Sequence, residues 1–149
     1  MFKHILLPTD GSKLSDKAVK QAIEVAKALG AKITAVHITS EYHLHLPDEG
    51  FATPESPALK RRSEVEEGAG AKKVLGTVME AAKTAGVECD LVMATSDMPY
   101  EMIINLSRKL KCDLIVKALH DRRGLQGILL GSETQNLLTH SSIPVLVCS

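Results

Sequence analysis

Short apolar runs rich in β-branched residues alternate along the chain with longer segments in which apolar residues recur at helical spacing. This alternation is typical of a parallel sheet whose strands are joined by crossover helices. It predicts an α/β fold with five strands and four helices. The predicted strands cover residues 4–7, 33–38, 87–94, 114–116 and 144–148.

The first two helices are predicted from apolar stripes with spacings of three and four residues. In the first helix the stripe runs from Val19 to Leu29, and Gly30 is the expected C-cap. The second helix begins at Pro57, after Ser56, or at Ser63, where a capping box follows. Three glycines weaken its first half, so its first turns are expected to fray.

The second half of the chain contains two shorter helices. One begins near Pro99, and the other begins at a capping box formed by Ser132 and Gln135. The earlier connection 39–55 is long for a βα loop, which is typical of a lid or of a disordered segment. The 149 residues are accounted for as one domain, 1–149, without repeats or an interdomain linker.

Composition excludes several classes of function. Hydrophobic residues make up 44% and charged residues 24%, as in ordinary globular domains. The 18 basic and 18 acidic residues balance, and aromatic residues make up only 3%, so nucleic acid is not an expected partner. No apolar run approaches the ~18 residues of a membrane span, so no membrane association is expected.

The three cysteines, Cys89, Cys112 and Cys148, include no CxxC pair. Neither a disulfide framework nor a thiolate zinc site is indicated, which favours a reducing cytoplasm. His43 and His45, with acidic residues nearby, form at most an incomplete metal site in what is more simply a polar loop.

Two strand ends carry candidate chemistry, because ligands of open α/β sheets bind beyond the carboxyl ends of the strands. Asp10, in the turn Pro8-Thr9-Asp10-Gly11-Ser12, could accept hydrogen bonds from a ribose or purine, lie near a metal, or only cap the next helix. The second candidate is a basic loop before a helix N-terminus, which is either a phosphate cradle or a solvated turn. Its residues are Lys117, His120, Arg122, Arg123, Gly131 and Ser132.

These segments resemble the universal stress protein family. The resemblance rests on Ile5-Leu6-Leu7-Pro8-Thr9-Asp10-Gly11-Ser12, Asp113-Leu114-Ile115-Val116, Arg122-Arg123-Gly124-Leu125, Leu129-Leu130-Gly131-Ser132 and Ile143-Pro144-Val145-Leu146-Val147. It implies a single Rossmann-like domain, similar to adenine nucleotide alpha hydrolases, with strand order 3-2-1-4-5. It also implies a homodimer in which the strands Pro144 to Cys148 meet antiparallel.

The resemblance further implies an ATP-type ligand between the first and fourth strands. Asp10 and the backbone around Ile38 would lie near the base and ribose, and the loop after the fourth strand would surround the phosphates. Mg²⁺ is expected only together with a nucleotide. The implied nucleotide-binding residues are Pro8, Thr9, Asp10, Ile38, Lys117, Ala118, His120, Asp121, Arg122, Arg123, Gly131, Ser132 and Glu133.

The phosphate motif departs from the family pattern G-x-x-G, nine residues, G and Ser or Thr. Ala118 and Asp121 stand where the two glycines belong, whereas Gly131 and Ser132 match. Glycine lets the backbone approach phosphates closely. A carboxylate ~4 Å from a phosphate charge costs ~1 kcal/mol in water and ~4 kcal/mol at an effective dielectric constant of about 20. Asp121 could avoid this cost by pairing with a neighbouring basic side chain.

The favoured hypothesis is a cytoplasmic, dimeric stress-response protein that acts through partners, with weak or absent ATP binding. The remaining basic residues could instead hold ATP or AMP in spite of Asp121. No G-x-S-x-G, Walker A or GxGxxG sequence is present, so no catalytic machinery is recognised. The alternative is a weak nucleotide-hydrolysing enzyme in which Asp10 places a metal and His120 carries a proton.

Overall fold

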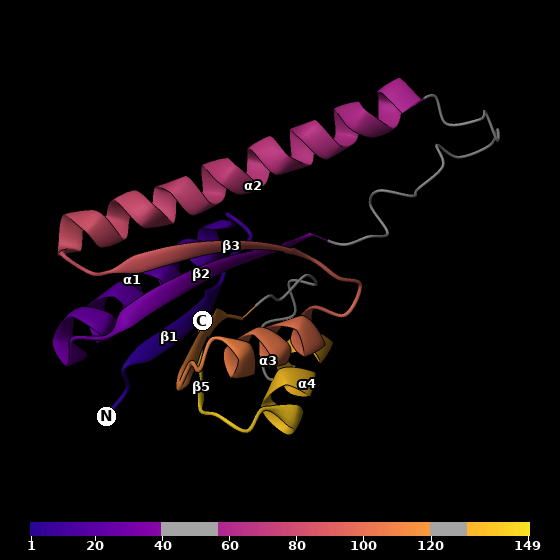
Figure 1. Ribbon diagram of the computed structural model, residues 1–149. Helices are drawn as coiled ribbons and strands as arrows, with labels where there is room; N and C mark the ends of the chain where they lie inside the picture. Colours follow the sequence, from indigo (N-terminus) through magenta and orange to yellow (C-terminus); the bar gives the residue numbers. More distant parts are fainter. Residues whose placement is uncertain (40–56, 120–130) are drawn as a thin grey trace.

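The computed structural model describes residues 1–39, 57–119 and 131–149, with residues 57–69 described by their backbone alone. Within these ranges, five parallel strands form one sheet in the order β3-β2-β1-β4-β5 (Figure 1). The predicted α/β class and strand order are therefore confirmed. The strands are β1 (His4–Pro8), β2 (Lys32–Thr39), β3 (Cys89–Thr95), β4 (Leu114–Ala118) and β5 (Val145–Cys148).

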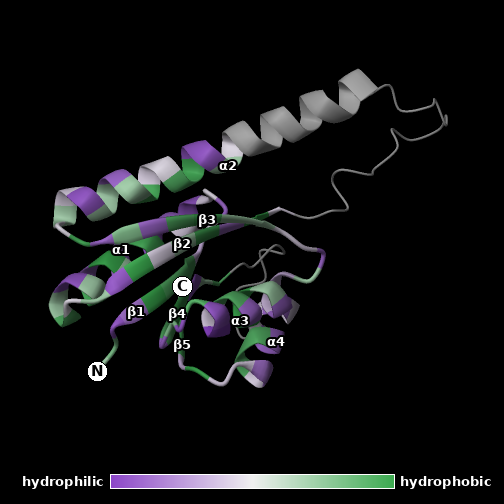
Figure 2. Cartoon of the chain, in the orientation of Figure 1, coloured by the Kyte–Doolittle hydropathy of each residue, from purple (hydrophilic) through white to green (hydrophobic). Residues whose placement is uncertain are grey.

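Four helices cover the two faces of the sheet. Side chains alternate between the faces of each strand, so Leu7 packs in one core layer with α1 and α2, and Leu6 packs in the other with α3 and α4. Figure 2 shows hydrophobic residues along β1, whereas hydrophobic and hydrophilic residues alternate in the described part of α2. The helices are α1 (Lys13–Leu29), α2 (Pro57–Ala85), α3 (Pro99–Lys109) and α4 (Ser132–His140).

β1 is the central strand and is hydrogen-bonded on both edges. It pairs with β2 over its whole length, from His4 opposite Lys32 to Pro8 opposite Val36. On its other edge, Ile5 and Leu6 pair with Leu114 and Ile115 of β4. Because Ile5, Leu6 and Leu7 are each fully buried, β1 reads as a continuous apolar run, as expected for a parallel strand covered on both faces.

Most predicted boundaries agree with the structure to within two residues, and α2 begins at Pro57, the earlier of the two predicted starts. The predicted capping box of α4 is wrong, because the N-cap is Gly131 and not Ser132. Ser132 is already the first helical residue, and Gln135 N bonds to Gly131 O at 3.0 Å. The loop 40–55 lies outside the described residues.

Two apolar positions also differ from the predicted pattern. Leu29, the last member of the predicted stripe of α1, is 44% exposed because the helix ends there, at the left-handed Gly30. Pro144 was expected to start the last strand, but β5 begins at Val145. Proline has no N–H for the sheet, although the Pro144 carbonyl does accept a bond from Ile115 N at 3.0 Å.

Candidate functional site

The carboxyl ends of β1 and β4 lie next to each other at the point where the strand order reverses. From β1 the chain passes through α1 to β2 on one side, and from β4 it passes through α4 to β5 on the other side. Residues that follow these two strands therefore lie side by side at the place where such sheets usually bind ligands, the crevice beyond the carboxyl ends of the strands. The predicted grouping of the two strand ends is thus supported by the topology.

The β1–α1 turn is held by its own hydrogen bonds. Thr9 is buried, and its N–H donates to Val36 O of β2 at 2.9 Å. The Asp10 Oδ1 atom accepts from Ser12 N at 2.9 Å and from the Ser15 hydroxyl at 2.6 Å. The carboxylate therefore organises the start of α1, as in the simplest of the three interpretations, and its role toward a ligand stays a prediction.

Ser15 is a site residue that the sequence reasoning missed. Its side chain is 2% exposed, and its N–H donates to Ser12 Oγ at 3.2 Å, which makes Ser12 the N-cap of α1. A second serine in the first turn of a helix, five residues after an aspartate, is the sequence signal that could have revealed it. The two serines and Asp10 thus link the turn after β1 to the first turn of α1.

Gly11 brings the same turn against α2. Its φ is +79°, and a Cβ built at this position would lie 2.6 Å from Val74 Cγ2. Both the left-handed backbone and the close approach require glycine here. The position of the Asp10 turn is therefore coupled to α2, which sequence periodicity could not show.

The end of β4 adds a half-buried cation to this crevice. Burial lowers the pKa of the Lys117 amine, and the negative charges of Glu133 and Asp10 oppose that change. Asp10 in the turn after β1 and Glu133 in α4 are therefore both within electrostatic reach of Lys117 in β4. Ala118, the next residue, is 2% exposed and packs in the core layer of α1 and α2.

The first turn of α4 supplies the remaining described residues of the site. Gly131 and Ser132 stand at the helix N-terminus, where Ser132 is exposed and the N-cap Gly131 offers no side-chain cap. The Glu133 carboxylate turns toward α3 and accepts from Tyr100 N at 3.0 Å. The N–H groups and the partial positive charge of a helix N-terminus favour an anion. His120, Asp121, Arg122 and Arg123 lie outside the described residues.

β2 lies next to β1, on the side away from β4. The Ile38 side chain packs with the α3 and α4 layer, so only its backbone is placed for the expected contact with a base. The neighbouring His37 has a buried Nδ1 atom without a hydrogen-bond partner among the described residues. The sequence reasoning missed this nitrogen, because burial at a strand end depends on tertiary packing.

Neither a metal cluster nor a membrane helix is found in the described ranges. No group of three or more His, Cys, Asp or Glu side chains there could hold a metal ion. No helix within residues 1–39, 57–119 and 131–149 is long and apolar enough to span a bilayer. His43 and His45, the weak metal candidates, fall outside these ranges.

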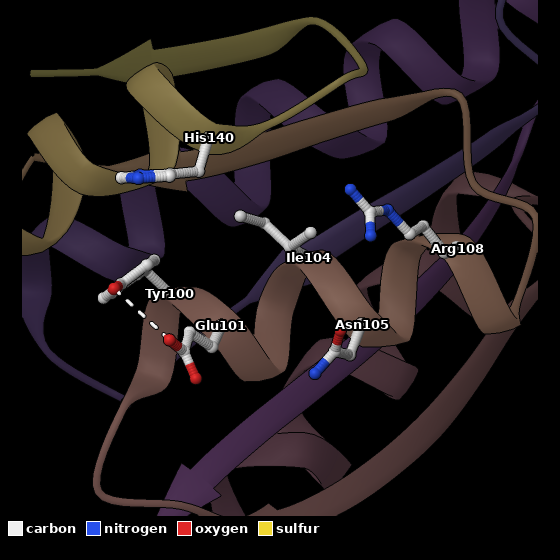
Figure 3. Close-up of a pocket in the computed structure, with 6 residues that line it drawn as sticks. All are labelled: Tyr100, Glu101, Ile104, Asn105, Arg108 and His140. Carbon is white, nitrogen blue, oxygen red and sulfur yellow. Dashed lines mark hydrogen bonds between the residues drawn. The ribbon is translucent and has the colours of Figure 1, made fainter.

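A separate pocket of about 320 Å³ lies between α3 and α4 (Figure 3). None of the predicted nucleotide-binding residues lines it. The Tyr100 and His140 rings form one end, with their centroids 5.7 Å apart. The remaining lining residues are Glu101, Ile104, Asn105 and Arg108. This pocket and the crevice at the ends of β1 and β4 are therefore different features.

Comparisons with known proteins agree with the fold and with the suspected family. A universal stress protein of Methanocaldococcus jannaschii is 35% identical over 148 residues, which is 99% of this chain and 82% of that protein. One from Thermus aquaticus is 32% identical over 99% of this chain and 98% of its own.

Solved structures give the same result for the fold. The M. jannaschii protein MJ0577 superimposes with a TM-score of 0.80 at 23% identity, covering 99% of this chain and 96% of its own. A universal stress protein in complex with cAMP gives 0.71 at 24% identity, with 99% and 97% covered. One from Archaeoglobus fulgidus in complex with dAMP gives 0.67 at 17% identity, with 100% and 98% covered. The universal stress protein family profile matches residues 1–149, and the chain belongs to that family.

Proposed function

We propose that this protein is a cytoplasmic regulatory protein that binds an adenine nucleotide weakly and acts as a homodimer, without catalysing a reaction. The observation that carries the proposal is the meeting of Asp10, Lys117 and the start of α4 at the strand-order reversal. Relatives of the same fold were solved with cAMP and with dAMP. The three free, buried cysteines suit a reducing compartment.

The described residues suit the two ends of an adenine nucleotide. At the phosphate end, Lys117 supplies a cation and the N-terminus of α4 supplies N–H donors beside the Ser132 hydroxyl. At the base end, the backbone of Ile38, near the carboxyl end of β2, would offer polar atoms. Mg²⁺ would be held by the phosphates of the nucleotide, because the described residues form no metal cluster of their own.

Affinity for ATP is expected to be low because Ala118 and Asp121 replace the two glycines of the phosphate motif. Asp121 adds negative charge where polyphosphate charge would accumulate, which at about 1–4 kcal/mol weakens binding by roughly ten- to a thousandfold. Ala118 is expected to matter less, since its methyl group is buried in the core.

Calorimetric titration with AMP, and with ATP in the presence and absence of Mg²⁺, tests this proposal. We expect weak binding of AMP, weaker or undetectable binding of ATP, and stronger ATP binding in Asp121→Gly. Asp97→Asn is the control for the loss of one negative charge, because it also removes an exposed carboxylate. Asp16→Gly is not used, because a glycine at that position would weaken α1. Tight ATP binding by the unmodified chain would show that the motif substitutions are harmless.

Dimerisation is proposed through β5, which is paired on one edge only. Its Leu146 side chain is 39% exposed, and an apolar edge strand invites pairing with another strand. On the opposite edge of the sheet, Leu91 of β3 is 38% exposed and provides a matched control. In analytical ultracentrifugation at tens of micromolar, Leu146→Lys is expected to be monomeric and Leu91→Lys dimeric. A monomeric unmodified chain would refute the dimer.

A binding role is favoured over hydrolysis by the position of Asp10. Its Oδ1 atom already accepts two hydrogen bonds from the helix start, which suits a structural carboxylate better than one that places a reactive metal. Phosphate release from ATP that disappears in both Asp10→Ala and His120→Ala would overturn this choice. Background hydrolysis that persists in both variants would support it.

A further inference from the structure

The N-terminus of α3 is capped by a side chain from another helix. Its N-cap residue is Met98, which makes no side-chain cap hydrogen bond, and Pro99 occupies the first turn. The cap is supplied by Glu133 of α4, whose Oε2 atom accepts from Tyr100 N at 3.0 Å. A carboxylate at a helix N-terminus is stabilised by both the hydrogen bond and the helix dipole. The side chain of Glu133 is thus held in place.

Glu133 also follows directly after Ser132, at the phosphate end of the proposed nucleotide site. Lys117 lies within electrostatic reach of Glu133 and of Asp10. Glu133 and Asp10 therefore both act on the Lys117 ammonium group, so the negative charge of Glu133 extends to the strand ends although its carboxylate is bonded to α3. A carboxylate that caps α3 cannot turn away from an incoming phosphate without leaving the N–H of Tyr100 unpaired, which carries a cost of its own.

We propose that Glu133 is a specificity-determining residue, which limits the negative charge that the site accepts and makes it prefer adenosine monophosphates, linear or cyclic, over ATP. The inference rests on the proposed nucleotide-binding function and deepens it. Free ATP carries about two more negative charges than AMP, and each extra charge is repelled by the fixed carboxylate. At separations of about 8 Å and dielectric constants of about 40–80, the two charges together change affinity roughly five- to thirtyfold.

The variant Glu133→Gln separates charge from structure. A glutamine oxygen can still accept from Tyr100 N, so α3 stays capped, while the negative charge is removed. Glu101→Gln is the matched control, since it removes one carboxylate from the exposed surface of α3, outside the crevice. Glu133→Ala removes both the charge and the cap.

The measurement is the ratio of the dissociation constants for ATP and AMP, obtained by calorimetry without Mg²⁺, together with the melting temperature. Glu133→Gln is expected to lower the ratio about five- to thirtyfold at a nearly unchanged melting temperature, and Glu101→Gln is expected to leave it within about twofold. Glu133→Ala is expected to lower both the ratio and the melting temperature.

Three results would overturn the inference. An unchanged ratio in Glu133→Gln, with AMP binding measurable, would make Glu133 a structural cap only and leave the proposed function intact. An equal change of the ATP to AMP ratio in Glu101→Gln would show that the effect comes from the net charge of the protein and not from the position of Glu133. Absence of binding by every nucleotide to every variant would overturn the proposed function itself, and this inference with it.

Discussion

Replacing Gly11 by alanine tests whether the turn after β1 is fixed against α2. Alanine at φ +79° carries the left-handed backbone penalty of about 1–2 kcal/mol. Its Cβ would also lie 2.6 Å from Val74 Cγ2. Valine in a helix has one strongly preferred rotamer, so Val74 cannot easily rotate away and the overlap adds about 1–3 kcal/mol. We expect Gly11→Ala to lower the free energy of unfolding by about 2–5 kcal/mol.

Gly30 offers a matched control for the backbone penalty. Its φ is +65°, and nothing lies within 4 Å of a Cβ built there. Gly30→Ala should therefore cost about 1–2 kcal/mol, without a steric contribution. Urea denaturation followed by circular dichroism measures both variants, and the difference between them isolates the contact with α2.

Truncating Val74 should restore part of the stability that Gly11→Ala loses. In a Val74→Ala background, we expect Gly11→Ala to cost no more than Gly30→Ala does in the unmodified chain, because only the backbone penalty remains. Equal costs for Gly11→Ala and Gly30→Ala in the unmodified chain would refute the reasoning. So would a Gly11→Ala penalty that persists in full when Val74 is truncated, since the strain would then lie elsewhere.

Three further predictions concern stability and reactivity. Leu137→Ala should cost about 2–5 kcal/mol in urea denaturation because Leu137 is fully buried, whereas Leu138→Ala, at a position 41% exposed, should cost less than about 1 kcal/mol. For Asp113, burial acts to raise the carboxyl pKa, but hydrogen bonds from the backbone of His4 and Lys3 outweigh it and the pKa is lowered. Its contribution to stability is therefore present above about pH 4 and lost as the pH falls further, so Asp113→Asn should show a smaller loss of melting temperature on acidification. Burial raises the pKa of the Cys112 thiol to about 11, so alkylation at about pH 8 should modify it only after unfolding in urea, and rapid labelling of the native chain would contradict this.

The architecture could be predicted because it depends on local patterns. Apolar runs such as Ile5 to Leu7 mark strands that are buried on both faces, and the stripe of α1 marks a helix with one buried side. The order of the strands came from the family resemblance, since periodicity does not say which strand pairs with which.

The site was predictable only as far as the strand-end rule reaches. That rule grouped Asp10 with Lys117, which the structure places within electrostatic reach. It could not show that Ser15 braces Asp10 or that Glu133 caps α3, because these contacts depend on rotamers and on how two helices pack. The capping box of α4 failed for a related reason, since the helix starts one residue earlier than the motif requires.

The central position of β1 determines how the chain can fold during its synthesis. Once the ribosome has released residues 1–95, β1, β2 and β3 can assemble with α1 and α2 on one face. The other face, with Leu6 and Val36, stays uncovered until α3 and α4 emerge. The second edge of β1 stays unpaired until β4 is made, because the contact between Lys3 and Asp113, immediately before β4, spans 110 residues. A nascent half-sheet of this kind is prone to aggregate, so a released 1–95 fragment would be a client for chaperones in a way that the finished protein is not.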